Sequence, residues 1–211
     1  MTELVFILDR SGSMSGLESD TIGGFNAMIE KQKREEGQTV VSTVLFDSET
    51  QVLHDRLPLE KILPMTEDDY TVRGTTALLD AVGKAIHHIG NVHKYARIED
   101  RPDRTLFVIT TDGYENCSRQ YDYPRVRQMI ERQKEKYGWE FLFLGANIDA
   151  AKEAGRLGIA AEHAANYHAD SAGTALTFDA VAEAVTAVRK GCAIGEKWRR
   201  SIDDDMRRRG R

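Results

Sequence analysis

The chain has 211 residues, of which 41% are hydrophobic and 30% are charged, and its formal net charge at pH 7 is −5. This is the composition of a globular protein of about one domain, so a disordered chain and a fibrous repeat are both excluded. The longest apolar runs, residues 4–8 and 141–144, are too short to cross a bilayer, and polar residues follow the first where a signal peptide has its cleavage site. We therefore expect neither a membrane anchor nor a signal peptide.

Cysteine content and charge distribution bear on the location and partners of the protein. Only Cys117 and Cys192 are present, without the paired spacing of a disulfide framework or a cysteine metal site, so we expect a protein of the reducing cytoplasm, from a bacterium. Residues 197–211 carry seven basic and three acidic residues, a net charge of +4, which leaves −9 on residues 1–196. This acidic body argues against nucleic acid as a partner, because neutralising phosphates needs a cationic surface.

Short apolar runs alternate with amphipathic stretches along the chain. Continuous apolar runs predict buried strands, and apolar residues at helical spacing, such as Leu17, Phe25 and Ile29, predict helices that bury one face. In chain order we expect a strand at 3–8, a helix at 16–36, a strand at 39–46, an antiparallel edge strand at 51–57, a helix at 77–89, a strand at 105–110, a helix at 123–137, a strand at 139–144, a helix at 150–157, a weak strand at 164–168 and a last helix at 178–188.

This order of elements predicts a doubly wound, Rossmann-like α/β fold. Its central sheet is expected to be mostly parallel, with one antiparallel edge strand and with helices on both faces. We expect one domain over residues 1–195 and a charged C-terminal tail over residues 196–211 that is either helical or mobile. Ligands of such sheets bind at the carboxyl ends of the strands, so the polar residues that follow each apolar run are the candidates for a site.

The first of these polar segments, D-R-S-G-S-M, begins at Asp9 directly after the first predicted strand. Gly12 permits a tight turn in which the hydroxyls of Ser11 and Ser13 face the same side as the Asp9 carboxylate. One charged and two neutral oxygens suit Mg²⁺ or Mn²⁺. Alternatively, a serine caps the following helix and Asp9 is a solvated turn residue.

Two later segments also place oxygen-bearing side chains next to predicted strands and helices. In G-T-T, which leads into the helix predicted at 77–89, Thr75 or Thr76 is a possible helix cap, and Asp80 is a possible solvated helical charge. In I-T-T-D-G an apolar strand runs directly into Asp112, which is followed by a glycine turn. Taken alone, Asp112 has a catalytic, a metal-linked or a structural role.

Together the three segments resemble the von Willebrand factor type A domain. The metal-ion-dependent adhesion site (MIDAS) of that family combines D-x-S-x-S, a threonine in a G-x-T loop and an aspartate in a T-D-G turn, and all three occur here in the family's order. The resemblance covers residues 3–190, and it favours Thr76 over Thr75 because Thr76 holds the third place of the G-T-T segment. It implies a metal site formed by Asp9, Ser11, Ser13, Thr76 and Asp112.

The resemblance also implies a mechanism of binding. In the family's ligand-competent arrangement the serines and the threonine bind the metal directly and the aspartates act largely through water, so the divalent charge is poorly compensated. An Asp or Glu carboxylate of a partner protein then completes the site. Direct binding of the ion by one of the domain's own carboxylates weakens this attraction and gives the family an affinity switch. We expect a binding module and no enzyme, with Mg²⁺ or Mn²⁺ as its cofactor.

Two other functions remain open at this point. In a metal-dependent phosphoesterase, Arg10 and Arg73 would hold the phosphate, although Ser11 stands where a haloacid-dehalogenase-like phosphatase has its second aspartate, and the Walker signature is absent. The other is a metal-free scaffold with a vestigial site.

The six histidines lack zinc-site spacing and are expected at the solvated surface. Candidate contact residues near the ion, each of which alternatively packs inward, are Met14, Tyr114 and Tyr121.

Overall fold

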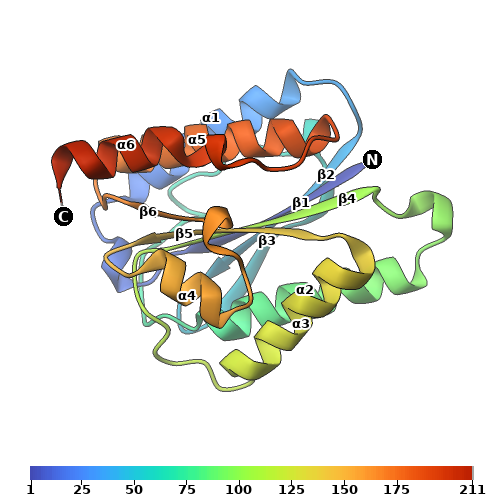
Figure 1. Ribbon diagram of the computed structural model, residues 1–211, viewed down its shortest axis with the longest axis horizontal. Coiled ribbons are helices and arrows are strands. Elements are labelled where there is room, and N and C mark those ends of the chain that lie inside the picture. Colours follow the sequence, from blue (N-terminus) through green and yellow to red (C-terminus); the bar gives the residue numbers. More distant parts are fainter. Residues whose placement is uncertain (211) are drawn as a thin grey trace.

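A six-stranded sheet runs through the middle of the computed structural model, which describes residues 1–210 (Figure 1). Its strands lie in the order β3-β2-β1-β4-β5-β6, and all neighbours are parallel except β2 and β3, which are antiparallel. The predicted fold class, with its antiparallel edge strand, is therefore confirmed. The strands are β1 (Thr2–Asp9), β2 (Thr39–Phe46), β3 (Thr50–Pro58), β4 (Arg104–Thr111), β5 (Glu140–Ala146) and β6 (Ala164–Tyr167).

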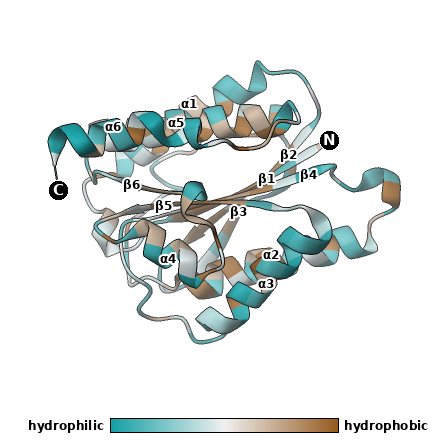
Figure 2. Cartoon of the chain, viewed as in Figure 1, coloured by the Kyte–Doolittle hydropathy of each residue, from teal (hydrophilic) through white to brown (hydrophobic). Residues whose placement is uncertain are grey.

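Helices cover both faces of the sheet. Because successive side chains of a strand point to opposite faces, Leu4 and Phe6 of β1 belong to different apolar layers from Val5 and Ile7. Hydrophobic residues are concentrated in the strands and on the inner sides of the helices (Figure 2). One face is covered by α1 (Glu18–Lys33), α5 (Ser171–Arg189) and α6 (Arg200–Arg209), and the other by α2 (Leu78–Tyr95), α3 (Tyr123–Tyr137) and α4 (Ala150–Arg156).

The predicted element boundaries differ most from the structure at two helices. Helix α5 begins at Ser171, seven residues before the predicted start, because the Asp170 carboxylate caps it by accepting a hydrogen bond from the Gly173 N–H at 2.8 Å. Apart from the half-buried Leu176, its first turns contain small and polar residues, so no apolar stripe marks them in the sequence. Helix α2 continues to Tyr95, beyond the predicted end at residue 89, through a mostly polar turn. None of the helices described in residues 1–210 is long and apolar enough to span a membrane.

The charged C-terminal tail is helical as far as Arg209 and packs against the body of the protein. A short 3-10 helix, η5 (Glu196–Arg199), leads into α6. Trp198 and Ile202 are buried in the same apolar layer as α5, and the Trp198 indole donates a hydrogen bond to the Glu162 carbonyl at 3.0 Å. Arg209 reaches from α6 to the Asp170 carboxylate at 2.6 Å. The tail therefore contributes to the core as well as to the surface charge.

The strand order also fixes where a ligand site is expected. From β1 the chain continues to β2 on one side, and β4 pairs with β1 on the other. The crossovers therefore diverge at the carboxyl ends of β1 and β4, which is the topological switch point where doubly wound sheets bind ligands. Asp9 is the last residue of β1 and Thr111 is the last residue of β4.

Candidate metal centre

Asp9 connects the two central strands at the switch point. Its carboxylate accepts a hydrogen bond from the Ser11 N–H at 2.7 Å and another from the Thr111 hydroxyl at 2.6 Å. The Tyr70 hydroxyl donates to the Asp9 carbonyl from the other side. Both carboxylate oxygens of Asp9 therefore have fixed partners, and the side chain is held in one orientation.

Three hydroxyls from two separate segments meet beside Asp9. The Thr76 hydroxyl donates to the Ser11 hydroxyl at 3.1 Å, and the hydroxyls of Ser11 and Ser13 are hydrogen-bonded at 3.1 Å. Ser13, in the short 3-10 helix η1 (Gly12–Met14), donates in turn to the Asp112 carboxylate at 2.5 Å. The structure thus brings together the side chains that the sequence analysis selected from three distant segments.

Backbone contacts hold the segment before α2 against the first loop and explain which threonine faces the hydroxyls. The Gly12 N–H donates to the Gly74 carbonyl at 3.1 Å, and Gly74 has a φ of +69°, a left-handed conformation that favours glycine. The Thr76 N–H donates to the Asn116 side chain at 2.9 Å, whereas the exposed Thr75 bonds to the Cys117 thiol. Thr76, and not Thr75, therefore joins the cluster.

The two aspartates are buried charges without a cationic partner. Asp9 is 1% exposed and Asp112 is 2% exposed, and neither forms an ion pair within residues 1–210. Burial raises the pKa of Asp9 to about 6, against the hydrogen bonds from Thr111 and Ser11, and burial also raises the pKa of Asp112 above its usual range. One oxygen of the Asp112 carboxylate, Oδ2, is buried and has no hydrogen-bond partner in the described chain.

These donors fit a hard divalent cation. Hydroxyl and carboxylate oxygens are the ligands that Mg²⁺ and Mn²⁺ prefer, and a bound cation would offset the cost of burying two carboxylates side by side. The site is not of the kind built mainly from charged or imidazole ligands, because residues 1–210 contain no group of three or more His, Cys, Asp or Glu placed to hold a metal. Asp112 Oδ2 is the carboxylate oxygen of the site that has no hydrogen-bond partner in the described chain, so it is free to bind a cation.

The two arginines near the site in sequence both bond to Asp47. The buried Arg10 guanidinium donates to the Asp47 carboxylate at 2.8 Å and to the Gln51 side chain at 2.6 Å. Arg73 donates to the same Asp47 oxygen at 3.0 Å. Although burial alone raises the pKa of Asp47, the Glu49 N–H and the two arginines lower it below its usual range. Asp47 was not among the residues predicted for the site, although its position directly after β2 is the kind of position that marks the others.

Two carboxylates that were not predicted to have this role, those of Asp80 and Glu115, hold the loop after β4 in place. The Asp80 carboxylate is buried and accepts hydrogen bonds from the N–H groups of residues 119–121, so it is not a solvated helical charge. Glu115 accepts from the Leu79 N–H at 2.9 Å and from the Ser118 hydroxyl at 2.7 Å. These carboxylates fasten the loop that carries Asp112 to the beginning of α2.

The candidate contact residues separate into exposed and packed side chains. Tyr114 is exposed next to the site, and its hydroxyl accepts a hydrogen bond from the Asp149 N–H at 3.4 Å. Met14 is buried, and Tyr121 packs closely against Gly83 of α2. His54 is also buried, bonded to the Thr43 hydroxyl at 3.0 Å, so the expectation of surface histidines is wrong at this position.

No protein-family model matches the sequence, and no curated protein matches it. Solved structures do match. Proximal thread matrix protein 1 from the mussel byssus, in a structure with a zinc occupied MIDAS motif, has a TM-score of 0.58 at 12% identity over 88% of this chain and 46% of its own. A von Willebrand factor type A protein from Catenulispora acidiphila has a TM-score of 0.58 at 15% identity over 88% of this chain and 42% of its own.

The pilus adhesin SpaC from Lactobacillus rhamnosus GG has a TM-score of 0.65 at 10% identity over 89% of this chain and 30% of its own. At such identities the likeness shows a shared fold. The chain spans less than half the length of these three proteins.

Proposed function

Because the chain has the fold of a von Willebrand factor type A domain, we propose that it binds a divalent cation at Asp9, Ser11, Ser13, Thr76 and Asp112, and uses it to bind an acidic side chain of a partner protein. The observation that carries the proposal is the meeting of three hydroxyls with two buried carboxylates that have no cationic partner in the described chain. Mg²⁺ and Mn²⁺ are the cations that this donor set favours.

The residues divide into two roles. Ser11, Ser13 and Thr76 present neutral hydroxyl oxygens, which bind a cation without cancelling its charge. Asp9 has both oxygens occupied by Ser11 and Thr111, so it supports the cation electrostatically and fixes the loop. Asp112 positions Ser13 through one oxygen and offers the other, Oδ2. A bound divalent cation supplies the positive charge that attracts the partner's carboxylate.

The surroundings of the site favour protein binding over phosphoester hydrolysis. A phosphoesterase needs cationic groups directed at the transferred phosphate, and here Arg10 and Arg73 are both bonded to Asp47. Tyr114 lies exposed beside the cluster, and tyrosine is enriched at protein interfaces. The protein of similar fold that carries a zinc occupied MIDAS motif is a thread matrix protein, and another is an adhesin.

Affinity capture with and without a chelator tests the proposed function. Immobilised wild-type protein in Mg²⁺ is expected to retain a partner that EDTA releases and that renewed Mg²⁺ restores. Thr76→Ala is expected to retain much less, and Thr75→Ala as much as the wild type, because only Thr76 joins the hydroxyl cluster. Retention that is insensitive to EDTA would contradict capture through a metal.

An assay with p-nitrophenyl phosphate separates the enzymatic alternative. We expect no hydrolysis above background in Mg²⁺ or Mn²⁺. Hydrolysis that is lost in Asp112→Ala would instead assign a phosphoesterase activity to the site. Failure of the wild type to bind either metal in a calorimetric titration would leave the metal-free scaffold as the account of this fold.

A further inference from the structure

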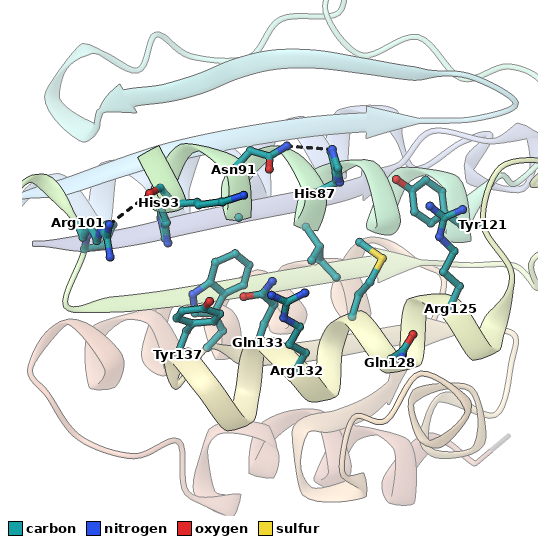
Figure 3. A pocket seen from close by; sticks show the side chains of 16 residues that line it. His87, Asn91, His93, Arg101, Tyr121, Arg125, Gln128, Arg132, Gln133 and Tyr137 are labelled. Atoms are coloured by element: carbon teal, nitrogen blue, oxygen red, sulfur yellow. Dashed lines mark hydrogen bonds between the residues drawn. The ribbon is translucent and has the colours of Figure 1, made fainter. Parts of the chain in front are cut away.

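A groove of about 640 Å³ lies between α2 and α3, on the face of the sheet opposite α1 and α5 (Figure 3). Its apolar lining comes from Ile86 of α2, Met129 of α3 and Trp139, which stands just before β5. Trp139 is almost fully buried, and its ring stacks on that of Phe107 of β4 with 5.2 Å between the ring centroids, so it forms part of the floor of the groove. Tyr121 and Arg125 lie toward one end, and Arg101 and Tyr137 toward the other (Figure 3).

The groove is cationic although the body of the protein is acidic. Lys94, Arg101, Arg125 and Arg132 line it, together with His87 and His93, and no Asp or Glu is among the lining residues. None of the four Lys and Arg side chains forms an ion pair with a carboxylate in residues 1–210, whereas neighbouring Arg97 and Arg127 do. Among the pairs that the structure describes, His93 is the one lining residue bonded to an acid, the buried Glu3, which is also paired with Arg56.

One polar atom beside the groove is buried and unpaired. The side chain of Gln133 lies against Gly90 of α2, and its amide oxygen is buried with no hydrogen-bond partner among residues 1–210. Because this oxygen is not exposed, an occupant of the groove does not reach it. The features that an occupant meets are the basic side chains and the apolar lining, so a matching occupant carries negative charges and apolar groups.

We propose that this groove binds an acidic, extended peptide segment of a partner protein. Arg125 and Arg132 are seven residues apart on α3, about 10 Å along the helix axis at 1.5 Å per residue. An extended peptide covers that distance in about three residues, so acidic side chains spaced along it come within reach of both arginines. A cluster for one phosphate would instead gather its cations at a single point.

The groove contains none of the residues of the metal centre, so it is tested by a separate experiment. Fluorescence anisotropy is measured in EDTA with a fluorescein-labelled ten-residue peptide in which Glu alternates with Phe, Leu and Pro, and with the same peptide carrying Gln at every Glu. We expect the Glu peptide to bind about tenfold more tightly than the Gln peptide. Asp112→Ala, which alters the metal centre, is expected to bind the Glu peptide like the wild type. The metal proposal and the groove proposal can therefore fail independently.

Charge reversals on α3 locate the binding surface. Arg132→Glu and Arg125→Glu exchange exposed side chains of the groove and are each expected to weaken binding of the Glu peptide about tenfold. Lys136→Glu makes the same change of charge on the same helix outside the groove and is expected to weaken it less than about twofold. Circular dichroism verifies that each variant is folded.

Three results would overturn the proposal: no binding of the Glu peptide, equal binding of the Gln peptide, or equal effects of Arg132→Glu and Lys136→Glu. A labelled ten-nucleotide DNA strand is the competing occupant. If the strand binds more tightly than the Glu peptide, with the same dependence on Arg132, the groove is assigned to nucleic acid instead.

Discussion

The Thr76 hydroxyl donates a hydrogen bond to the Ser11 hydroxyl at 3.1 Å, although 65 positions separate the two residues along the chain. The contact depends on the left-handed turn at Gly74 and on the Gly74 carbonyl, which accepts from the Gly12 N–H. Thr75, one position earlier, is exposed and bonds to Cys117. Two adjacent threonines therefore have different environments, and this difference can be tested directly.

Thr76→Ala is expected to remove most of the thermal stabilisation that Mg²⁺ gives the wild type, because a ligand that binds only the folded state stabilises it in proportion to the logarithm of its affinity. Thr75→Ala is expected to keep that stabilisation. In EDTA, Thr76→Ala is expected to lower the free energy of unfolding by about 1 kcal/mol, the contribution of one hydrogen bond. Equal Mg²⁺-induced shifts in Tm for both variants would count against a role for Thr76.

Asp80→Asn is expected to lower the free energy of unfolding by about 1 to 3 kcal/mol at pH 7, because three backbone N–H groups lose a charged acceptor. Burial alone raises the pKa of Asp80, but these N–H groups bring it below its usual range. The carboxylate therefore stabilises the fold above the unfolded pKa of about 4, and this stabilisation is lost as the pH falls through the lower folded pKa. Urea unfolding of both proteins between pH 7 and pH 3 measures it, and a difference that grows on acidification would refute this account.

Two adjacent glycines of α1 provide a matched test of the packing of α1 against α5. A Cβ at Gly24 would lie 2.3 Å from the Phe178 ring of α5, whereas a Cβ at Gly23 would meet no atom within 4 Å. Gly24→Ala is therefore expected to destabilise the protein by about 1 to 3 kcal/mol, and Gly23→Ala to stabilise it by up to about 1 kcal/mol. Chemical denaturation measures both, and similar effects of the two substitutions would mean that α1 does not approach α5 this closely.

Trp198→Ala tests whether the C-terminal tail belongs to the core. Removing this buried ring and its hydrogen bond to Glu162 is expected to cost about 3 to 5 kcal/mol of unfolding free energy. Lys197→Ala, which changes the exposed neighbouring side chain, is expected to change stability by less than about 0.5 kcal/mol. A small effect of Trp198→Ala would indicate a tail that does not stabilise the body.

Much of the fold could be predicted from the sequence because its central strands contain continuous apolar runs. β2 and α3 have the predicted bounds, and the weak strand at 164–168 is present as β6. The beginning of α5 could not be found from periodicity, because small residues in its first turns leave no apolar stripe and the start is set by the Asp170 cap. Burial of the tail depends on two apolar side chains, Trp198 and Ile202, which are too few to form a pattern.

The candidate site was predictable in its hydroxyls and aspartates, because spaced motifs mark them, but not in the residues that hold them. The Asp47 carboxylate accepts hydrogen bonds from both nearby arginines, and Glu115 connects the loop after Asp112 to the beginning of α2. These are contacts between segments far apart in the chain, and no local spacing encodes them. The cationic groove was missed for the same reason, since its lysine and arginines are spread over α2, the segment after α2, and α3.

The most direct test is a calorimetric titration of Mn²⁺ into wild-type protein, Ser13→Ala and Asp112→Ala, with Thr75→Ala as the control. We expect the wild type and the control to bind one Mn²⁺ per chain. Ser13→Ala and Asp112→Ala are expected to bind at least about tenfold more weakly, a loss of about 1.4 kcal/mol or more. Absence of Mn²⁺ binding by the wild type, or equal affinity in all four proteins, would contradict a cation site at these side chains.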